Sequence, residues 1–291
     1  MKIAVLSDIH GNVPALRAVV EDIDAWEPDQ VIVNGDIVNR GPRSDICLEF
    51  VLNRQQEDGW HILSGNHEEY LLSCASLEFG TEGPAFEVNR FAFWAYKQLN
   101  GAVSQLASLP EQFTWWAPDG SEFRVIHASM RSNRDGLYEE QSDKALERRI
   151  APAPAVFVTA HTHQAFKRQV NHSLIANVGS VGAPFDLDWR PSYGRFTWQN
   201  QSGWTAEIPR VTYDRCLIEA DYVRSGFLEE AGPLAQLMLV ELRRARGLIF
   251  RWAEHYEKAV LEGEISMQDS VKRILREEDI QPFLGPPGWV L

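Results

Sequence analysis

Short apolar runs alternate with helical patterns along the first quarter of the chain. The apolar runs begin the stretches 2–8, 30–36 and 60–68, and each ends in a polar segment that contains glycine or is followed by it. Apolar residues recur at helical spacing in 11–26, which Asn12 and Pro14 can start, and in 43–56. Strands that alternate with helices predict parallel βαβ units, and open sheets of this kind bind ligands at the carboxyl ends of their strands.

The pattern changes after a further helical stretch at 83–109. Residues 112–130 have the pattern of two strands around a Pro-Asp-Gly turn, and short β-type segments continue to about residue 211. From about Asp214 onward the pattern is helical, most clearly at 234–260. The chain is therefore expected to form an α/β unit followed by a helical region.

This change places a boundary between residues 1–212 and a helical C-terminal extension at 213–291. The extension carries too much apolar surface to be a free tail, so we expect it to pack on the first part or to form a homodimer. The last segment, 283–291, is expected to be extended.

Composition narrows the class of partner. The 291 residues are 44% hydrophobic and 24% charged, and 28 basic against 41 acidic residues give a net charge of −13. Without a cluster of Lys and Arg, a long nucleic acid is not an expected partner, whereas a small phosphate-bearing ligand is compatible if bound metals reverse the local field.

Targeting signals and cysteines point to the cytoplasm. The apolar run at the N-terminus is too short for a signal peptide, and no segment approaches membrane-spanning length. Cys47, Cys74 and Cys216 have no metal-type spacing, and we interpret them as reduced thiols. We therefore predict a cytoplasmic protein without a membrane partner.

Polar side chains gather where the apolar runs end. Five of the eight histidines lie at such ends, together with two aspartates and one asparagine: Asp8, His10, Asp36, Asn66, His67, His127, His161 and His163. Asp8 and His10, like His161 and His163, are two residues apart, so that on a strand they face the same side. A single histidine at a strand end is more often a hydrogen-bonded surface group, but all five places together favour a metal site.

Imidazole, carboxylate and amide ligands without a thiolate suit Mn²⁺, Fe²⁺ or Zn²⁺. The set holds more ligands than one ion needs, which indicates two ions. A dinuclear site about 3.5–4 Å across can clamp a phosphoryl group during an in-line displacement.

The motifs resemble the five motifs of the calcineurin-like metallophosphoesterases, in the same order over about residues 1–200. They are Asp8-x-His10, Gly35-Asp36-x-x-x-Arg40, Gly65-Asn66-His67-Glu68, His127 and His161-Thr162-His163. The resemblance implies an α/β fold, a four-layer α/β/β/α sandwich with metals at the strand ends, in which residues 1–212 form the catalytic domain.

The resemblance also implies a role for each position. One ion would be held by Asp8, His10, Asp36 and His163, and the other by Asp36, Asn66, His127 and His161, with Asp36 as the bridge. A hydroxide shared by the ions would attack phosphorus, His67 would protonate or stabilise the leaving oxygen, and Arg40 would bind phosphoryl oxygens. Mn²⁺ is the favoured ion, with Fe²⁺, Zn²⁺ and Ni²⁺ as alternatives.

Two positions depart from the family pattern. Asn39 precedes Arg40 where phosphoprotein phosphatases have Asp, so we expect a less basic His67. Ala160 stands where many members have Gly, which is tolerable unless the position needs a positive φ. Glu68 is expected to support a ligand or to act as an acid at a helix N-terminus.

A glycine-rich loop at 177–186 resembles a loop of small bacterial phosphoesterases, a group that includes phosphodiesterases and diadenosine-polyphosphate hydrolases. Phe185 follows the glycines of this loop, and Trp189 and Tyr193 come after it. These aromatic residues could stack on a nucleobase or simply pack in the interior.

The sequence therefore predicts a dinuclear metal-dependent phosphoesterase that hydrolyses a small phosphodiester or nucleotide-type substrate. A dinucleoside-polyphosphate hydrolase is the alternative, and phosphoprotein phosphatase activity and a non-catalytic scaffold are disfavoured. The sequence leaves open the native metal, the substrate, the oligomeric state, the role of residues 213–291 and the effect of Asn39 on the choice between mono- and diesters.

Overall fold

The computed structural model describes residues 1–100, 102–277 and 279–285. Its first sheet has the strand order β10-β9-β1-β2-β3. The strands of this sheet are β1 (Lys2–Leu6), β2 (Gln30–Asn34), β3 (His61–Leu63), β9 (Gly194–Gln199) and β10 (Gly203–Glu207). β1, β2 and β3 are parallel, and β9 runs antiparallel to β1 and to β10.

The second sheet has the order β4-β5-β6-β8-β7. Its strands are β4 (Gln112–Trp116), β5 (Glu122–Ile126), β6 (Val156–Thr159), β7 (Phe166–Val170) and β8 (Ser173–Asn177). β5, β6 and β8 are parallel, whereas β4 pairs with β5 as the antiparallel hairpin that the Pro-Asp-Gly turn predicts.

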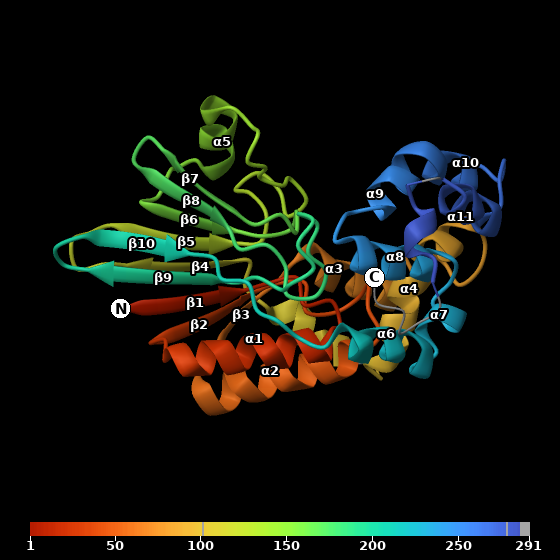
Figure 1. Ribbon diagram of the computed structural model, residues 1–291, viewed down its shortest axis with the longest axis horizontal. Helices are drawn as coiled ribbons and strands as arrows, with labels where there is room; N and C mark the ends of the chain where they lie inside the picture. The colour runs from red at the N-terminus through yellow and green to blue at the C-terminus, as the bar shows by residue number, and fades with distance from the viewer. Residues whose placement is uncertain (101, 278, 286–291) are drawn as a thin grey trace.

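The two sheets lie face to face between helices, which confirms the predicted four-layer sandwich (Figure 1). Helices α1 (Val13–Trp26) and α2 (Ser44–Asp58) cover the first sheet, and α5 (Asp143–Ile150) covers the second. The alternation along β1 explains this: Ile3 and Val5 enter the core between the sheets, while Ala4 and Leu6 face the helices. Each face of β1 is therefore buried.

Helix α1 begins as the sequence predicts. The Asn12 side chain accepts a hydrogen bond from the Ala15 N–H at 3.1 Å, and a proline lies in the first turn. The Asn12 amide also donates to the Gly182 carbonyl at 2.9 Å. The helix start is thus tied to the loop that follows the last strand of the second sheet.

The helix predicted at 83–109 is shorter than expected. Helix α4 (Pro84–Gln98) is followed by Asn100, whose φ is +47°, and then by the 3₁₀ segment η1 (Ala102–Ser108). The left-handed residue ends the helix because it turns the backbone away from the helical path.

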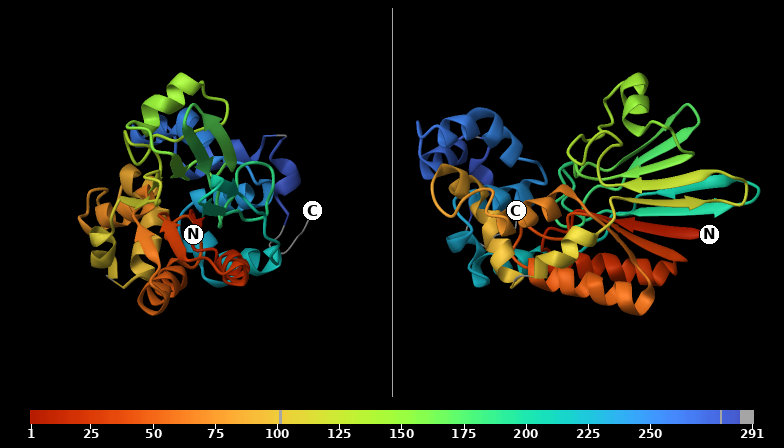
Figure 2. Two further views of the ribbon diagram at one scale, coloured as in Figure 1. Left: turned by 90° about the vertical axis from the view of Figure 1, so that its left-hand side faces the viewer. Right: turned by 180° about the vertical axis from the view of Figure 1, so that it is seen from behind.

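The C-terminal region is a group of short helices that pack on α4. They are α6 (Arg215–Arg224), α7 (Phe227–Glu230), α8 (Leu234–Arg244), α9 (Ile249–Trp252), the π-helical η2 (Ala253–Glu257), α10 (Lys258–Leu261), α11 (Met267–Leu275) and η3 (Gln281–Phe283). Both opposite views place them beyond the carboxyl ends of the strands (Figures 1 and 2). The Trp94 ring of α4 lies 4.9 Å from the Phe227 ring.

The helical pattern at 234–260 is interrupted at Ala245, whose φ is +49°. The tail predicted as extended begins inside η3 at Phe283, and residues 286–291 lie outside the described residues. The division between 1–212 and 213–291 remains a prediction. In the parts of the chain that the structure describes, the helices are too short or too polar for a membrane crossing.

Candidate metal centre

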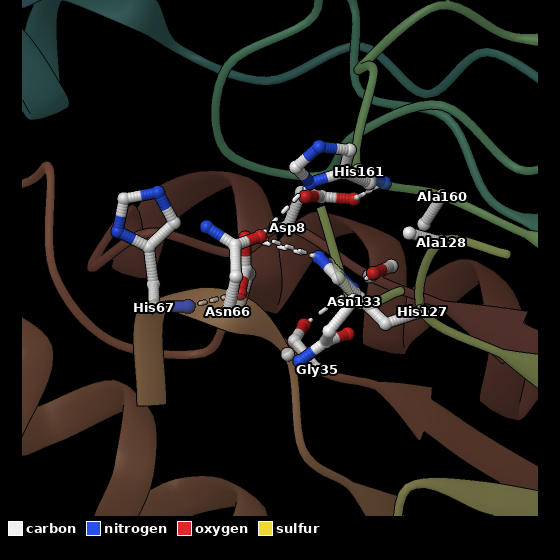
Figure 3. A network of polar contacts seen from close by, with 12 residues as sticks. Asp8, Gly35, Asn66, His67, His127, Ala128, Asn133, Ala160 and His161 are labelled. Atoms are coloured by element: carbon white, nitrogen blue, oxygen red, sulfur yellow. Dashed lines mark hydrogen bonds and ion pairs between the residues drawn. The ribbon is translucent and has the colours of Figure 1, made fainter. Parts of the chain in front are cut away.

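The predicted site residues come from the carboxyl ends of strands in both sheets. Asp8 and His10 follow β1, Asp36 follows β2, and His127 follows β5. Asn66 and His67 begin helix α3 (Asn66–Ala75) directly after β3, and His161 and His163 follow β6. The parallel strands of both sheets end at one edge, and the structure brings these side chains together there. Figure 3 shows Asp8, Asn66, His67, His127 and His161 at this place.

Several of these residues have a left-handed backbone. The φ angles lie between 47° and 68° at Asp8, His10, Asp36, Asn39, Arg40, His161 and His163. Asp, Asn and His tolerate this region better than other non-glycine residues, and Arg does not. Because such strain persists only where surrounding contacts enforce it, its concentration here is typical of a functional site. Ala160 does not have a positive φ, so the alanine is tolerated.

One cluster consists of Asp8, His10 and His163. Asp8 Oδ1 lies 3.1 Å from His163 Nε2 and 3.8 Å from His10 Nε2, and the two Nε2 atoms are 3.2 Å apart. All three side chains are buried. Asp8 Oδ1 is itself buried without a hydrogen-bond partner.

A second cluster surrounds Asp36 and Asn66. His127 Nε2 lies 3.3 Å from Asp36 Oδ2 and 3.1 Å from Asn66 Oδ1. Asn66 Oδ1 is also 2.8 Å from His161 Nδ1, so that the amide oxygen stands between two imidazoles, as Figure 3 shows.

Asp36 connects the two clusters. Its Oδ2 atom lies 3.7 Å from His10 Nε2 as well as near His127, while its Oδ1 accepts a hydrogen bond from the His67 backbone N–H at 2.8 Å. Ligand atoms of Asp36, His10 and His67 form a third group within 4.8 Å, although the resemblance does not make His67 a ligand. Asp36 Oδ2 therefore lies near a histidine of each cluster.

Hydrogen bonds fix which imidazole nitrogen faces the clusters. The Nδ1 atoms of His127, His163 and His10 lie 2.8, 2.6 and 3.3 Å from the carbonyl oxygens of Asn34, Ala183 and Val38, to which only an N–H can donate. Each Nε2 lone pair is therefore directed at a carboxylate oxygen, an amide oxygen or another Nε2. Acceptors at these distances repel unless a proton or a metal cation lies between them, so the donor set fits two divalent ions.

The protonation states also suit metal ligands. Burial raises the pKa of Asp36, but His127 and His67 outweigh burial and bring it well below its usual value. Burial lowers the pKa of His10 to about 3 and that of His161 to about 4, so both imidazoles are neutral near pH 7. For His127 the Asp36 carboxylate overcomes burial and raises the pKa to about 10, which means that a proton takes the place that a cation would fill.

Glu68 holds the backbone that carries the ligands, and the sequence did not reveal how many backbone groups it binds. Its side chain is fully buried and accepts hydrogen bonds at 2.8 Å from the backbone N–H groups of Gly65, Asp36 and Ile37. It thus closes a capping box at the start of α3 and holds the loop that carries Asp36. Burial, together with the Asp36 charge, raises the pKa of Glu68 to about 7.

The Asn39 side chain contacts both Arg40 and His67. Asn39 Oδ1 accepts from the Arg40 backbone N–H at 2.8 Å, which leaves Asn39 Nδ2 facing His67 Nδ1 at 2.9 Å. Because the amide nitrogen donates, the neutral His67 carries its proton on Nε2. Burial lowers the pKa of His67 well below its usual value, and the charge of Arg40 acts in the same direction.

The three aromatic residues after the glycine-rich loop have different positions. The Phe185 ring stacks on the His163 ring at 4.4 Å and therefore lies at the site. Trp189 contacts Tyr213 instead, with ring centroids 5.8 Å apart. Tyr193 packs in the interior and cannot stack on a nucleobase, because it is fully buried; its hydroxyl group donates a hydrogen bond to Asp22.

Arg40 has a partner that sequence reasoning missed. Its Nη2 donates to Glu241 Oε2 at 2.6 Å, across 201 residues of chain. The signal in the sequence was a single acidic residue inside the apolar stretch 234–242 of α8. Nothing in its spacing indicated which cation it would meet.

Comparison with known proteins places the chain in a family. The model of the calcineurin-like phosphoesterases matches residues 1–174, more than half of the chain. An uncharacterised protein of Methanocaldococcus jannaschii is 26% identical over 228 residues, which cover 73% of this chain and 88% of the relative. The symmetrical bis(5'-nucleosyl)-tetraphosphatase of Actinobacillus succinogenes is 26% identical over 132 residues, 45% of each chain.

A solved structure has the same fold. The metallophosphoesterase of Sphaerobacter thermophilus superposes with a TM-score of 0.65 at 23% identity, covering 84% of this chain and 100% of that one. The family match extends over the motifs up to His163, and the side chains of those motifs converge on paired clusters of metal-type ligands. The chain therefore belongs to the calcineurin-like phosphoesterases and is a metal-dependent phosphoric ester hydrolase.

Proposed function

We propose that the protein is a dinuclear phosphoesterase that hydrolyses a small phosphodiester or nucleotide-type substrate. The observation that carries this proposal is the pair of ligand clusters that meet at Asp36, each with acceptor atoms facing one another at 3.1 to 3.3 Å. Such pairs of nitrogen and oxygen acceptors are favourable only with a proton or a metal cation between them.

Asp8, His10, Asp36 and His163 would hold one ion, and Asp36, Asn66, His127 and His161 the other. When bound, two divalent ions would lower the pKa of coordinated water toward neutrality and neutralise charge on the phosphoryl oxygens. The nitrogen and oxygen ligands are compatible with Mn²⁺, which we favour, and with Fe²⁺, Zn²⁺ or Ni²⁺.

The chain itself would supply binding and proton control. His67 carries an Nε2 proton that is available to a leaving oxygen, because its Nδ1 accepts from the Asn39 amide. Arg40 would bind phosphoryl oxygens with the donors of its guanidinium that Glu241 leaves unused.

A small substrate is supported by the charge of the chain. The net charge of −13 disfavours a long polyanion, which would need many phosphate-neutralising cations. A cytoplasmic location is supported by the unpaired Cys47 and Cys74 in the interior, since buried free thiols are typical of reducing compartments. A homodimer through the C-terminal helices stays a prediction, which sedimentation analysis can test.

A dinucleoside-polyphosphate hydrolase is the second candidate. It is favoured by the 26% identity to the tetraphosphatase of Actinobacillus succinogenes over 132 residues. Chromatography of the products from diadenosine tetraphosphate decides between the candidates. If the protein is a dinucleoside-polyphosphate hydrolase, metal-dependent cleavage of diadenosine tetraphosphate should have a higher kcat/KM than cleavage of small phosphodiesters.

The first test measures turnover and metal together. The purified protein should hydrolyse bis-p-nitrophenyl phosphate in the presence of Mn²⁺ and lose this activity after chelation. Asp36→Asn removes the charge that both clusters share, so metal content and kcat/KM should fall together, the latter by about 100-fold or more.

Glu69→Asn is a matched control, because Glu69 is a neighbouring carboxylate that pairs with Asn133 and Arg134 outside the clusters. Its metal content and activity should stay at the level of the unchanged protein. Absence of metal-stimulated turnover of diesters, monoesters and diadenosine tetraphosphate alike would refute the proposal.

A further inference from the structure

Arg40 and Glu241 form a buried ion pair between the two ends of the chain. Arg40 follows β2, and Glu241 lies on α8 in the C-terminal region. Their side chains are only 14% and 3% exposed, so the Nη2–Oε2 contact of 2.6 Å is shielded from water. A charge-assisted hydrogen bond in such a setting is stronger than a solvent-exposed ion pair and holds its two side chains in a more defined geometry.

The other oxygen of Glu241 is held as well. Glu241 Oε1 accepts hydrogen bonds from the backbone N–H groups of Leu248 and Ile249 at 2.5 and 2.7 Å. These groups lie at the start of α9, after the left-handed Ala245 has ended α8. The carboxylate therefore has donors on two sides and cannot rotate without losing one of them. The fixed carboxylate of Glu241 therefore restrains the position of the Arg40 guanidinium.

The same turn between α8 and α9 contacts Phe185. A Cβ atom on Gly247 would lie 3.4 Å from Phe185 Cδ2, and the Leu187 N–H donates to the Ala245 carbonyl at 2.9 Å. The Phe185 ring in turn stacks on His163 with ring centroids 4.4 Å apart, and its centroid lies 5.8 Å from the guanidinium carbon of Arg40. The C-terminal helices thus contact a stack that ends on a predicted metal ligand.

We propose that Glu241 is a positioning residue for Arg40, through which the C-terminal helices become part of the phosphate-binding site. This inference rests on the proposed function of Arg40. A long side chain on a left-handed backbone has many rotamers, and Glu241 selects the one in which the guanidinium lies over the Phe185 ring. The remaining N–H groups are then directed in advance toward the phosphoryl oxygens, which lowers the entropic cost of binding them.

Glu241→Gln tests this with little change in shape. A glutamine has one acceptor oxygen, so its NH₂ group must face either the Arg40 guanidinium or the two backbone donors. We expect kcat/KM for bis-p-nitrophenyl phosphate at saturating Mn²⁺ to fall about 10- to 100-fold, with the affinity for inorganic phosphate reduced in parallel and metal content unchanged. Glu241→Asp keeps the negative charge but moves it away from Arg40 by one methylene group. Its loss of kcat/KM should be smaller than that of Glu241→Gln.

The matched control is Glu219→Gln. Glu219 is a fully buried acid of α6 whose carboxylate contacts Arg243 of α8, the helix that also carries Glu241, at 2.8 Å. Glu219→Gln should lower Tm about as much as Glu241→Gln does. It should leave kcat/KM and phosphate affinity within about twofold of the unchanged protein, since it does not alter the contacts of the Arg40 guanidinium.

A double-mutant cycle separates positioning from general support of the fold. In an Arg40→Ala background, Glu241→Gln should change kcat/KM and phosphate affinity by no more than about twofold, because the residue through which it acts is gone. Equal losses from Glu241→Gln in both backgrounds would overturn the inference, and so would an unchanged or tighter phosphate affinity in the single variant.

Phosphate binding by calorimetry, measured on the Mn²⁺-loaded protein, keeps the two proposals apart. If the unchanged protein has no metal-dependent turnover, the proposed function fails, whereas the calorimetric comparison of Glu241→Gln, Arg40→Ala and Glu219→Gln still decides the inference. If turnover is present but Arg40→Ala leaves it unchanged, the positioning role fails alone.

Discussion

Asn39 lies between the backbone of Arg40 and the ring of His67. Its oxygen accepts from one and its NH₂ group donates to the other, at 2.8 and 2.9 Å. An aspartate here would accept from both, which places a proton on His67 Nδ1 and favours the imidazolium. A single side chain therefore sets both the tautomer and the basicity of the group that faces the leaving oxygen.

Asn39→Asp should raise the pKa of His67 from its lowered value, because the new carboxylate stabilises the charged ring. An imidazolium is the stronger acid for an alkyl leaving group, so hydrolysis of an alkyl phosphodiester should increase at pH values below the new pKa and fall as the pH rises through it. Bis-p-nitrophenyl phosphate, whose leaving group needs no proton, should show little change.

Profiles of kcat/KM against pH for the two substrates test this expectation. Addition of His67→Ala to the Asn39→Asp protein should abolish the difference between the substrates. If the alkyl ester has the same profile with asparagine and aspartate, the Asn39 contact does not control proton transfer.

The loop after β2 and the start of α3 are built as one unit. A Cβ atom on Gly65 would lie 2.2 Å from Asp36 Oδ1, so only glycine permits this approach. Glu68 then joins the two segments through the N–H groups of Gly65, Asp36 and Ile37. The three-residue strand β3 is too short to position these ligands by its own hydrogen bonds.

Glu68→Gln should weaken this unit, since an amide NH₂ would face backbone donors inside a site without water access. We expect the free energy of unfolding to fall by about 2–3 kcal/mol and metal affinity to fall with it. Urea unfolding and metal titration measure the two effects. Glu69→Gln, one position further and partly exposed, should change the free energy of unfolding by less than about 0.5 kcal/mol, and equal effects of both substitutions would contradict the role of Glu68.

Across the whole molecule, the carboxyl ends of both sheets face the C-terminal helices (Figures 1 and 2). This arrangement buries the ligand clusters, and burial controls their protonation. The pKa values of His10 and His161 are lowered to about 3 and 4 from 6.5, so the folded state excludes protons that the unfolded chain binds below pH 6.5.

The metal-free protein should therefore lose stability as the pH falls from 6.5 to about 4, and each of these two histidines contributes about 1.4 kcal/mol for each pH unit. The lowered pKa of His67 adds a contribution of the same sign, whereas the raised pKa of Glu68, about 7, opposes one of them between pH 6.5 and 4.5. His127 does not offset this, because its raised pKa of about 10 gives a stabilisation that is fully present below 6.5 and is lost only as the pH rises toward 10. The lowered pKa values of Asp8 and Asp36 matter only below 3.8.

Urea unfolding of chelator-treated protein at several pH values measures this slope. His10→Gln should reduce the slope by the contribution of one proton. A free energy of unfolding that is constant between pH 6.5 and 4.5 would contradict the assignment of neutral buried imidazoles.

The local pattern was sufficient for the strands, the first helices and the motifs. A continuous apolar run predicts β1, and Asn12 caps α1. The polar residues after β1, β2, β3, β5 and β6 could be recognised because parallel strands bring their carboxyl ends to one edge. These features depend on neighbouring residues, whose periodicity is visible in the chain itself.

Contacts between distant segments could be decided only by the tertiary structure. The end of α4 at Gln98, the burial of Tyr193, the three donors that meet Glu68 and the pairing of Arg40 with Glu241 have no local signal. The sequence by itself determined which ligands this protein offers and at which strand ends they stand. The packing of the sheets and of the C-terminal helices decided which atoms face one another and in which protonation state, because both depend on distances and burial between residues up to 201 positions apart.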